Sequence, residues 1–268
     1  MGFLEVAHKK LKESYLISLK VFSNLMELRE GAIAGHSRRV ADHARRLAQR
    51  LGLSDNEVQD VMFAGLLHDI GKIGLPDRLL HKPFSALTTE ERAEVVKHPA
   101  TGQAALMALE NMKETARLIR GHHERFDGMG YPDGLSGMAI PRGARILAVA
   151  NDYDAVQIGS LLSRRLTETE AREFLLEGRG KRYDPKVTDA FLEMLGGIDS
   201  SAYAGPEVKT PSSALHGGMA LARDLVSHDG LLLLSKDYLL DDAMIRQIRE
   251  FEQTEGKPLT IYVRPGKG

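Results

Sequence analysis

The chain has 268 residues, 43% of them hydrophobic and 27% charged, so it is long enough to bury a substantial core and too apolar to be largely disordered. A net charge of -1 excludes a global attraction to nucleic acid or to an anionic membrane, and the lack of cysteine excludes disulfides and thiolate metal ligands. The sequence shows no signal peptide and no apolar run of about 18 to 20 residues. We therefore expect a cytoplasmic protein that binds no DNA, RNA or membrane.

The first predicted element is one long helix over residues 3–29. Four side chains at helical spacing share one of its faces: Tyr15, Leu19, Phe22 and Met26. This face can pack into a core. A sevenfold repeat from Leu4 to Leu25 also allows a connector or coiled-coil stem, which we assign to residues 1–34. A homodimer formed through this helix is a second possibility.

From Gly35 onward the pattern is helix after helix, which predicts an all-α bundle over residues 35–198. The predicted helices cover residues 36–52, 55–68, 89–96, 100–111, 112–123, 143–162, 168–178 and 185–196. Thr88 and Glu91 have the spacing of a capping box, and Thr167 with Glu170 repeats that spacing.

Residues 199–213 lose this periodicity and are predicted to form a linker. A small α+β unit of ββαβ order is expected over 214–268. Its predicted elements are strands at 219–226 and 231–234, a hairpin turn at His228-Asp229-Gly230, a helix starting at Asp241 or Asp242, and a strand at 259–263. The sequence does not indicate the function of this unit, for which we expect a structural or docking role.

Imidazole and carboxylate side chains recur inside the helical region. They are His36, His68, Asp69, His98, His122 and His123. Such groups bind divalent metals, with Fe, Mn, Ni or Zn as the candidates here. Adjacent residues on a helix diverge by about 100°, so the His-Asp and His-His pairs can each serve two neighbouring ions or need a helix end to converge. We expect two divalent metal ions, with Asp69 as the bridge because a carboxylate has two oxygens.

Four sequence segments surround these residues in a fixed order. They are Gly35-His36-Ser37, the run from His68 to Asp77, Lys97-His98-Pro99 with Gly102, and the loop from His122 to Pro132. In this combination the chain resembles the HD-GYP family of cyclic-di-GMP phosphodiesterases. The resemblance implies an HD-type helical bundle, metal-dependent hydrolysis of cyclic-di-GMP to pGpG or GMP, and a role as a signalling output domain.

The resemblance also implies roles for single residues. His36 and His68 would hold one metal, the other three histidines of the set would hold the second, and Asp69 would touch both. Lys72 would face the phosphate and protonate or stabilise the leaving group. The glycine-rich loop would contact substrate through Gly128, Gly130, Tyr131 and Pro132. Tyr131 could stack on guanine or pack in the core.

The chain departs from the family pattern at three places. Asn151 stands where a metal-binding aspartate is typical, so one negative charge is lost and metal affinity should fall. Asp152 could replace it only if the helix unwound locally, and Asp154 is expected to support the site. Residues 159–163 lack an arginine that would meet phosphate. Ala32 removes the extra glutamate of some members, so at most two metals are expected.

These features leave two main hypotheses, an active cyclic-di-GMP phosphodiesterase or a catalytically impaired domain. The impaired domain would bind a nucleotide or a protein partner such as a diguanylate cyclase. Activity as another phosphohydrolase of the broader HD superfamily is a third hypothesis.

The histidines outside the motifs are expected on the surface or in helix packing: His8, His43, His81, His216 and His228.

Overall fold

The computed structural model describes residues 17–19, 21–26, 29, 35–196, 207–230, 232–234, 240 and 242–264. The chain divides into two compact units, Met1–Leu195 and Gly196–Gly268. Within the described ranges, no helix combines the length and the apolar character that crossing a membrane requires.

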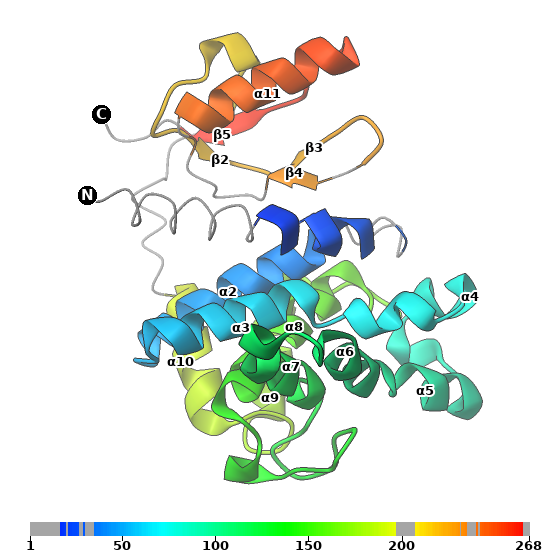
Figure 1. Ribbon diagram of the computed structural model, residues 1–268. Helices are drawn as coiled ribbons and strands as arrows, with labels where there is room; N and C mark the ends of the chain where they lie inside the picture. Colours follow the sequence, from blue (N-terminus) through cyan, green and yellow to red (C-terminus); the bar gives the residue numbers. More distant parts are fainter. Residues whose placement is uncertain are drawn as a thin grey trace. The chain divides into compact units, whose positions relative to one another are not determined.

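The first unit is all-α, as predicted (Figure 1). Its main helices are α2 (His36–Arg50), α3 (Asp55–Leu67), α6 (His98–Leu106), α7 (Lys113–Gly121), α8 (Arg142–Ile158), α9 (Glu168–Gly178) and α10 (Pro185–Gly196). Shorter helices are α4 (Asp77–Leu80) and α5 (Thr89–Val95), with 3₁₀ turns η1 (Ile70–Gly74), η2 (Phe84–Ala86), η3 (Glu110–Met112) and η4 (Gly137–Ala139).

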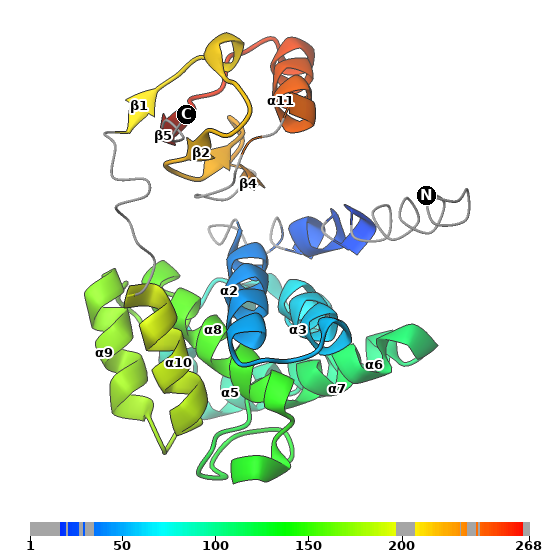
Figure 2. The same ribbon diagram turned by 90° about the vertical axis from the view of Figure 1, so that its left-hand side faces the viewer.

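The core of this unit forms where α2, α3, α7 and α8 pack together, as Figures 1 and 2 show from two sides. Val40, Leu47 and Ile119 are completely buried there, and most residues of α8 are buried. Gly65 of α3 allows the closest helix contact, because a Cβ at this position would lie 2.6 Å from the Cα of Ala41. The packing fixes the ends of α2, α3 and α7, which carry histidines of the predicted site.

Side-chain caps explain where several helices begin. Thr88 and Glu91 form the predicted capping box, and Thr167 and Glu170 form the second. Ser54 caps α3 in the same way, a box that the sequence analysis did not identify. Each box satisfies backbone N–H groups that would otherwise lack partners at the helix start.

Two of the predicted helices have wrong boundaries. The helix predicted at 143–162 ends at Ile158, because Gly159 adopts a left-handed conformation with φ 82° and closes α8. The helix predicted at 100–111 begins at His98 and ends at Leu106. Its last predicted residues form the separate turn η3 instead.

The described part of the predicted N-terminal helix is helical at 17–19 and 21–26. Leu19 is buried in the core, but Phe22 is 57% exposed, so the predicted common buried face is wrong at Phe22. Residues 1–16, which include Leu4 and Tyr15, and residues 30–34 lie outside the described residues. The dimer through this helix stays a prediction.

The second unit consists of short strands and one helix. Its elements are β1 (Val208–Lys209), the turn η6 (Ser212–Ala214), β2 (Ala220–Leu221), β3 (Leu225–Val226), β4 (Leu232–Leu234), α11 (Asp242–Glu255) and β5 (Tyr262–Arg264). β5 pairs antiparallel with both β1 and β2, and β3 pairs with β4 around the predicted turn, where Gly230 has φ 82°. Side chains of α11 pack with strand residues such as Leu221 and Val263 in a small core.

The predicted ββαβ order needs two corrections. The strand predicted at 219–226 is divided into β2 and β3, which belong to different sheets. The predicted linker 199–213 contains β1 and η6 in its second half. Its first half, up to residue 206, lies outside the described residues.

Backbone contact at Gly71 holds η1 against the start of α6. A Cβ on Gly71 would lie 2.0 Å from the carbonyl oxygen of His98 and 2.6 Å from the amide nitrogen of Gly102. Both obstacles are backbone atoms of α6, so no side-chain movement can relieve them. The chain therefore needs glycine here to bring Asp69 and His98 together.

We expect Gly71→Ala to lower the free energy of unfolding by about 3 kcal/mol, because the added methyl group forces η1 away from α6. Gly74→Ala is the matched control, since nothing lies within 4 Å of its added Cβ. Urea denaturation followed by circular dichroism measures both variants. Equal stability of the two variants would contradict the close contact.

Candidate metal centre

The structure brings the five histidines and Asp69 together as two triads. One triad is His36, His68 and Asp69, and the other is His98, His122 and His123. Within each triad, one ligand atom from every residue lies within 4.8 Å of the others. These residues come from the start of α2, the end of α3, the start of α6 and the end of α7.

Asp69 belongs to the first triad and also faces the second. Its Oδ2 is 3.3 Å from Nε2 of His68, and its Oδ1 is 3.4 Å from Nε2 of His98. Each oxygen thus faces a different triad, which is the arrangement that a bridging carboxylate needs. Burial alone would raise the pKa of Asp69, but His68 and Lys72 lower it well below its usual range. The carboxylate is therefore ionised and able to bind cations.

Three imidazoles are oriented by the backbone of their own helix turns. Nδ1 of His68 donates to the carbonyl of Gly65 at 2.9 Å, and Nδ1 of His98 donates to that of Val95 at 2.8 Å. His122 repeats the pattern with Ile119 at 2.6 Å. Because a carbonyl only accepts, the ring proton must be on Nδ1, which leaves Nε2 with a lone pair in the neutral ring.

The Nε2 atoms of these three histidines fit a metal site. They are buried and have no hydrogen-bond partner among the described residues. Buried polar atoms are nearly always paired, so three unpaired acceptors, two of them within 3.4 Å of the Asp69 carboxylate, are suited to bind cations. Histidine ligands of metals commonly donate their other ring nitrogen to a carbonyl or carboxylate, as these do.

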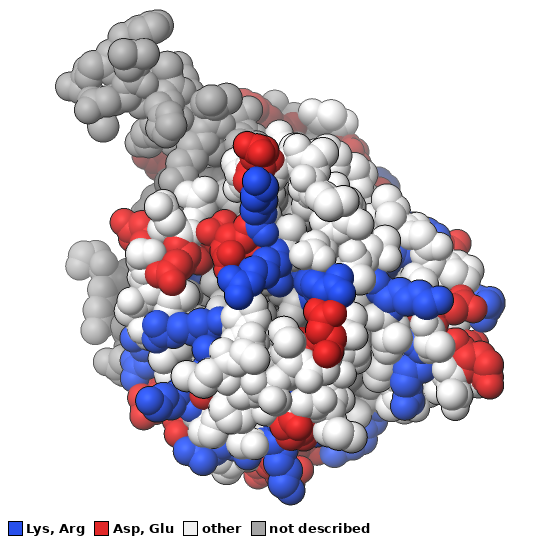
Figure 3. Space-filling view, turned by 60° about the horizontal axis from the view of Figure 1, so that its bottom comes forward, with Lys and Arg blue, Asp and Glu red and all other residues white. Residues whose placement is uncertain are grey.

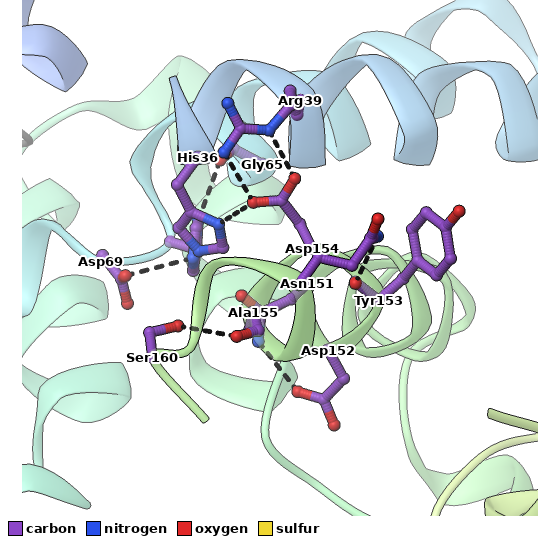
Figure 4. A network of polar contacts seen from close by, with 12 residues as sticks. His36, Arg39, Gly65, Asp69, Asn151, Asp152, Tyr153, Asp154, Ala155 and Ser160 are labelled. Atoms are coloured by element: carbon purple, nitrogen blue, oxygen red, sulfur yellow. Dashed lines mark hydrogen bonds and ion pairs between the residues drawn. The ribbon is translucent and has the colours of Figure 1, made fainter. Parts of the chain in front are cut away.

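His36 is oriented by a carboxylate instead. Its Nδ1 lies 2.7 Å from Oδ2 of Asp154, and Arg39 donates to both oxygens of Asp154 at 2.5 and 3.0 Å (Figure 4). Burial would raise the pKa of Asp154, but the hydrogen bonds and charges of His36 and Arg39 hold it far below its usual range. Asp154 therefore lies in the supporting position expected from sequence. Arg39 was not anticipated, although it lies one turn after His36.

Three of the five imidazole rings in the triads are neutral near pH 7. Burial lowers the pKa of His98 to about 4 and lowers the pKa of His122 and His123 well below 6.5. Burial also acts on His68, but the charge of Asp69 outweighs it and raises that pKa. A proton on His68 therefore competes with a metal ion for the same nitrogen.

Lys72 reaches Asp69 through a 3₁₀ turn. α3 ends at Leu67, and the chain continues as the 3₁₀ turn η1. A 3₁₀ helix has three residues per turn, so the side chains of Asp69 and Lys72 lie above one another. Nζ of Lys72 donates to Oδ2 of Asp69 at 2.7 Å.

Apart from His68, the residues of the two triads line a cavity of about 420 Å³. Besides the metal centre, its lining includes Lys72, Tyr131, Asn151 and four further cations, Lys82, Arg92, Arg125 and Arg182. On the face that Figure 3 shows, positive and negative side chains are interspersed. The positive charge in the cavity is therefore a local feature of a chain whose net charge is -1.

The glycine-rich loop contributes Tyr131 to the cavity, together with Glu124, Arg125 and Met129. The Tyr131 ring lies 4.8 Å from that of His123 and is stacked with that of Phe84 at 6.3 Å. Phe84 was not anticipated from sequence. The three rings form an aromatic surface beside the metal centre.

For the other loop residues, substrate contact stays a prediction, and the structure shows a folding role for the two glycines. Gly128, Gly130 and Pro132 do not belong to the described residues that line the cavity. Gly128 has φ 79°, and a Cβ on Gly130 would lie 2.3 Å from the amide nitrogen of Arg125. Both glycines allow the loop to fold on itself, which explains their presence without a ligand.

Asn151 and Asp152 are neighbours on α8 and both line the cavity. Nδ2 of Asn151 donates to Oδ1 of Asp152 at 3.1 Å. Oδ2 of Asp152 accepts from Nε of Arg182 at 2.6 Å and from the hydroxyl of Tyr183 at 2.7 Å. Asp152 points away from His36 (Figure 4), and α8 does not unwind, so Asp152 does not take the place of the missing aspartate.

The segment that lacks the expected arginine closes the cavity with its backbone. The carbonyl oxygens of Ser160 and Leu161 accept from the amides of Phe84 at 2.8 Å and Ser85 at 3.1 Å. Ser160 and Leu161 line the cavity. Arg164 pairs with Glu170 on the exposed side of α9, so it does not replace the missing arginine.

The remaining histidines that the structure describes lie on the surface or in helix packing, as predicted. The ring of His43 packs against Tyr153 and Phe191 at 5.5 and 5.6 Å. His81, His216 and His228 are exposed, and His8 lies outside the described residues.

Without metal, we expect stability to fall with acid because of His98. Its pKa is about 4 in the folded protein against 6.5 unfolded, so the unfolded state binds more protons between these values. Stability is therefore complete above about pH 6.5 and is lost as pH falls toward 4, by about 2 kcal/mol at pH 5. Urea denaturation in EDTA across this range measures the slope.

His98→Asn should flatten this slope, whereas His81→Asn, which changes an exposed histidine, should leave it as in the wild type. An unchanged slope in His98→Asn would contradict a neutral, buried His98.

Comparison with known proteins identifies similar sequences over most of the first unit. Residues 20–187 match a family model described as an HD domain. The cyclic di-GMP phosphodiesterase response regulator RpfG of Xanthomonas campestris is 38% identical over 71% of this chain and 52% of its own length. A cyclic di-GMP phosphodiesterase of Thermotoga maritima is 36% identical over 66% of this chain and 48% of its own length. The chain thus spans about half the length of these relatives.

Two solved structures share the fold. Bd1817, an HDG"Y"P protein from Bdellovibrio bacteriovorus, is 24% identical, with a TM-score of 0.53 over 62% of this chain and 53% of its own. The cyclic GMP-AMP specific phosphodiesterase V-cGAP3 of Vibrio cholerae is 19% identical, with a TM-score of 0.54 over 67% of this chain and 49% of its own.

Proposed function

Since the chain belongs to the HD domain family, within its HD-GYP branch, we propose that it is a metal-dependent phosphodiesterase that hydrolyses cyclic-di-GMP. One observation carries the proposal. The Nε2 atoms of His68, His98 and His122 are buried without partners beside the ionised carboxylate of Asp69. This donor set fits two divalent ions among Fe, Mn, Ni and Zn.

The names of the relatives support a cyclic dinucleotide as substrate. They include cyclic di-GMP phosphodiesterases and 3'3'-cGAMP-specific phosphodiesterases. We assign cyclic-di-GMP as the substrate and pGpG or GMP as the product, in a signalling role. The aromatic rings of Tyr131 and Phe84 support this choice, because a purine base can stack on them.

The proposed ligand set divides as the triads do. His36 and His68 would hold one ion and His98, His122 and His123 the other, with Asp69 shared and the amide oxygen of Asn151 as a further ligand. When bound, the two ions supply a water activated near neutral pH and neutralise charge on the phosphoryl oxygens.

The chain's own residues orient and complete this site. Asp154 and the backbone carbonyls fix the imidazole rings, which keeps their Nε2 atoms directed into the cavity. Lys72, at 2.7 Å from Asp69, is positioned to donate a proton or a hydrogen bond to the leaving oxygen. The aromatic surface of Tyr131, Phe84 and His123 lines the cavity beside this centre, as do Ser160 and Leu161.

A second candidate function rests on Asn151. The amide is neutral where the resemblance leads us to expect a carboxylate, and Asp152 does not replace it. An impaired domain would bind the cyclic dinucleotide, or a partner such as a diguanylate cyclase, without turnover. Hydrolysis separates the two candidates directly.

We expect linear pGpG or GMP after incubation of the protein with cyclic-di-GMP and an excess of Mn, Fe, Ni or Zn. Lys72→Met should lower kcat by about a hundredfold or more, since a positioned proton donor contributes this much. Chromatography of the products measures the rate. Lys113→Met is the matched control, because Lys113 is exposed on α7 and paired with Glu110. Nucleotide binding without any linear product would favour the impaired domain.

We expect fewer than two tightly bound metals per chain in the wild type. Asn151→Asp should raise the affinity for the weaker ion about tenfold or more and increase turnover, because it adds a negative charge to the ligand set. Metal titration by equilibrium dialysis measures the change. Asn111→Asp adds the same charge at an exposed position of η3 and should change neither quantity. Two equivalents of metal that survive dialysis of the wild type would contradict the weaker site.

A further inference from the structure

A cyclic dinucleotide carries two phosphodiester groups, and hydrolysis requires only one of them at the metal centre. The other brings a second negative charge into the cavity. A desolvated anion is costly unless cations or directed N–H donors compensate it. If the proposed function holds, the cavity therefore needs a second phosphate site away from the two triads.

The cations that line the cavity differ in how firmly they are held. Lys72 is bound to Asp69, a member of the metal centre, and Lys82 is exposed and bound to Glu91 at 2.6 Å. Arg92 is exposed and lies over the ring of Phe84 at 5.1 Å. Arg125 pairs with the exposed Asp127 of its own loop.

Arg182 is held by the buried carboxylate of Asp152 on α8. Asp152, which is only 4% exposed in its side chain, accepts from Nε of Arg182 at 2.6 Å, and the buried hydroxyl of Tyr183 donates to the same oxygen. The backbone carbonyl of Arg182 also accepts from the amide of Phe126 at 3.2 Å. Side chain and backbone are thus both anchored, which lowers the entropy cost of binding a ligand.

The anchor leaves most of the guanidinium for the cavity. Asp152 accepts the hydrogen bond of Nε. The N–H groups of Nη1 and Nη2 lie at the outer end of the guanidinium and are not used in this bond. Guanidinium N–H groups in this arrangement match two phosphate oxygens at once. Tyr131 lines the same cavity as Arg182. Burial raises the pKa of its phenol most, Asp152 raises it further, and Arg182 lowers it.

We propose that Arg182, positioned by Asp152, binds the phosphodiester of the cyclic dinucleotide that is not being cleaved. Residues 159–163 provide no arginine for phosphate, and Arg182 supplies one from the turn before α10. Asp152 cancels much of its charge, so Arg182 acts through directed hydrogen bonds more than through long-range attraction.

Two substrates test this assignment. Cyclic-di-GMP has a second phosphodiester, and bis(p-nitrophenyl) phosphate has only one, which must occupy the metal centre. Arg182→Gln should lower kcat/KM for cyclic-di-GMP by about tenfold to a hundredfold, mainly through KM, with a far smaller loss for the one-phosphate substrate. Arg182→Lys should lie between the wild type and Arg182→Gln, because it keeps the charge but not the fork. It also serves if Arg182→Gln does not fold.

Arg179→Gln is the matched control. Arg179 forms the same kind of pair with Asp189, at 2.7 Å, on the exposed side of the neighbouring turn. This variant should keep wild-type values for both substrates. Metal content, measured in parallel by mass spectrometry, should match the wild type in all three variants.

Equal losses for both substrates, no loss for either, or a loss of bound metal in the Arg182 variants would overturn the assignment. Absence of turnover of both substrates by the wild type would instead refute the proposed function, and this assignment with it.

Discussion

The site depends on one interaction, the placement of the Asp69 carboxylate between imidazoles from four helices. Each oxygen faces a different triad, at 3.3 Å from His68 and 3.4 Å from His98. This placement requires η1 to lie against the backbone of α6, which only glycine at position 71 permits. A residue without a side chain thus determines where the central carboxylate lies.

The imidazoles are directed before any ion binds. His68, His98 and His122 each use Nδ1 to bond the carbonyl three residues earlier, so the helix ends themselves set the ring orientation. The unpaired Nε2 atoms carry a desolvation cost that a bound cation would remove. This cost is the physical reason to interpret the cluster as a metal centre and not as a packed core.

Much of this site could be predicted from sequence, because the ligand residues stand in local motifs whose spacing survives folding. The all-α unit and the capping boxes at Thr88 and Thr167 followed from periodicity and local hydrogen-bonding rules. Tertiary contacts could not be predicted in the same way. Arg39, Phe84 and Arg182 reach the site from separate elements, and no local pattern distinguishes them from surface residues.

The glycine-rich loop illustrates the limit of motif reasoning. Its glycines suggested contact with a ligand, yet the close neighbours of Gly130 are the backbone atoms of Glu124 and Arg125. The second unit shows a similar limit, because strands as short as β2 and β3 carry too few residues for a distinct alternation.

X-ray absorption spectroscopy of the metal-loaded wild type tests the central claim most directly. The account predicts several imidazole nitrogens around each ion and a metal–metal distance of about 3.5 to 4 Å, set by the shared carboxylate. A coordination shell of oxygen alone, without imidazole scattering, would contradict it.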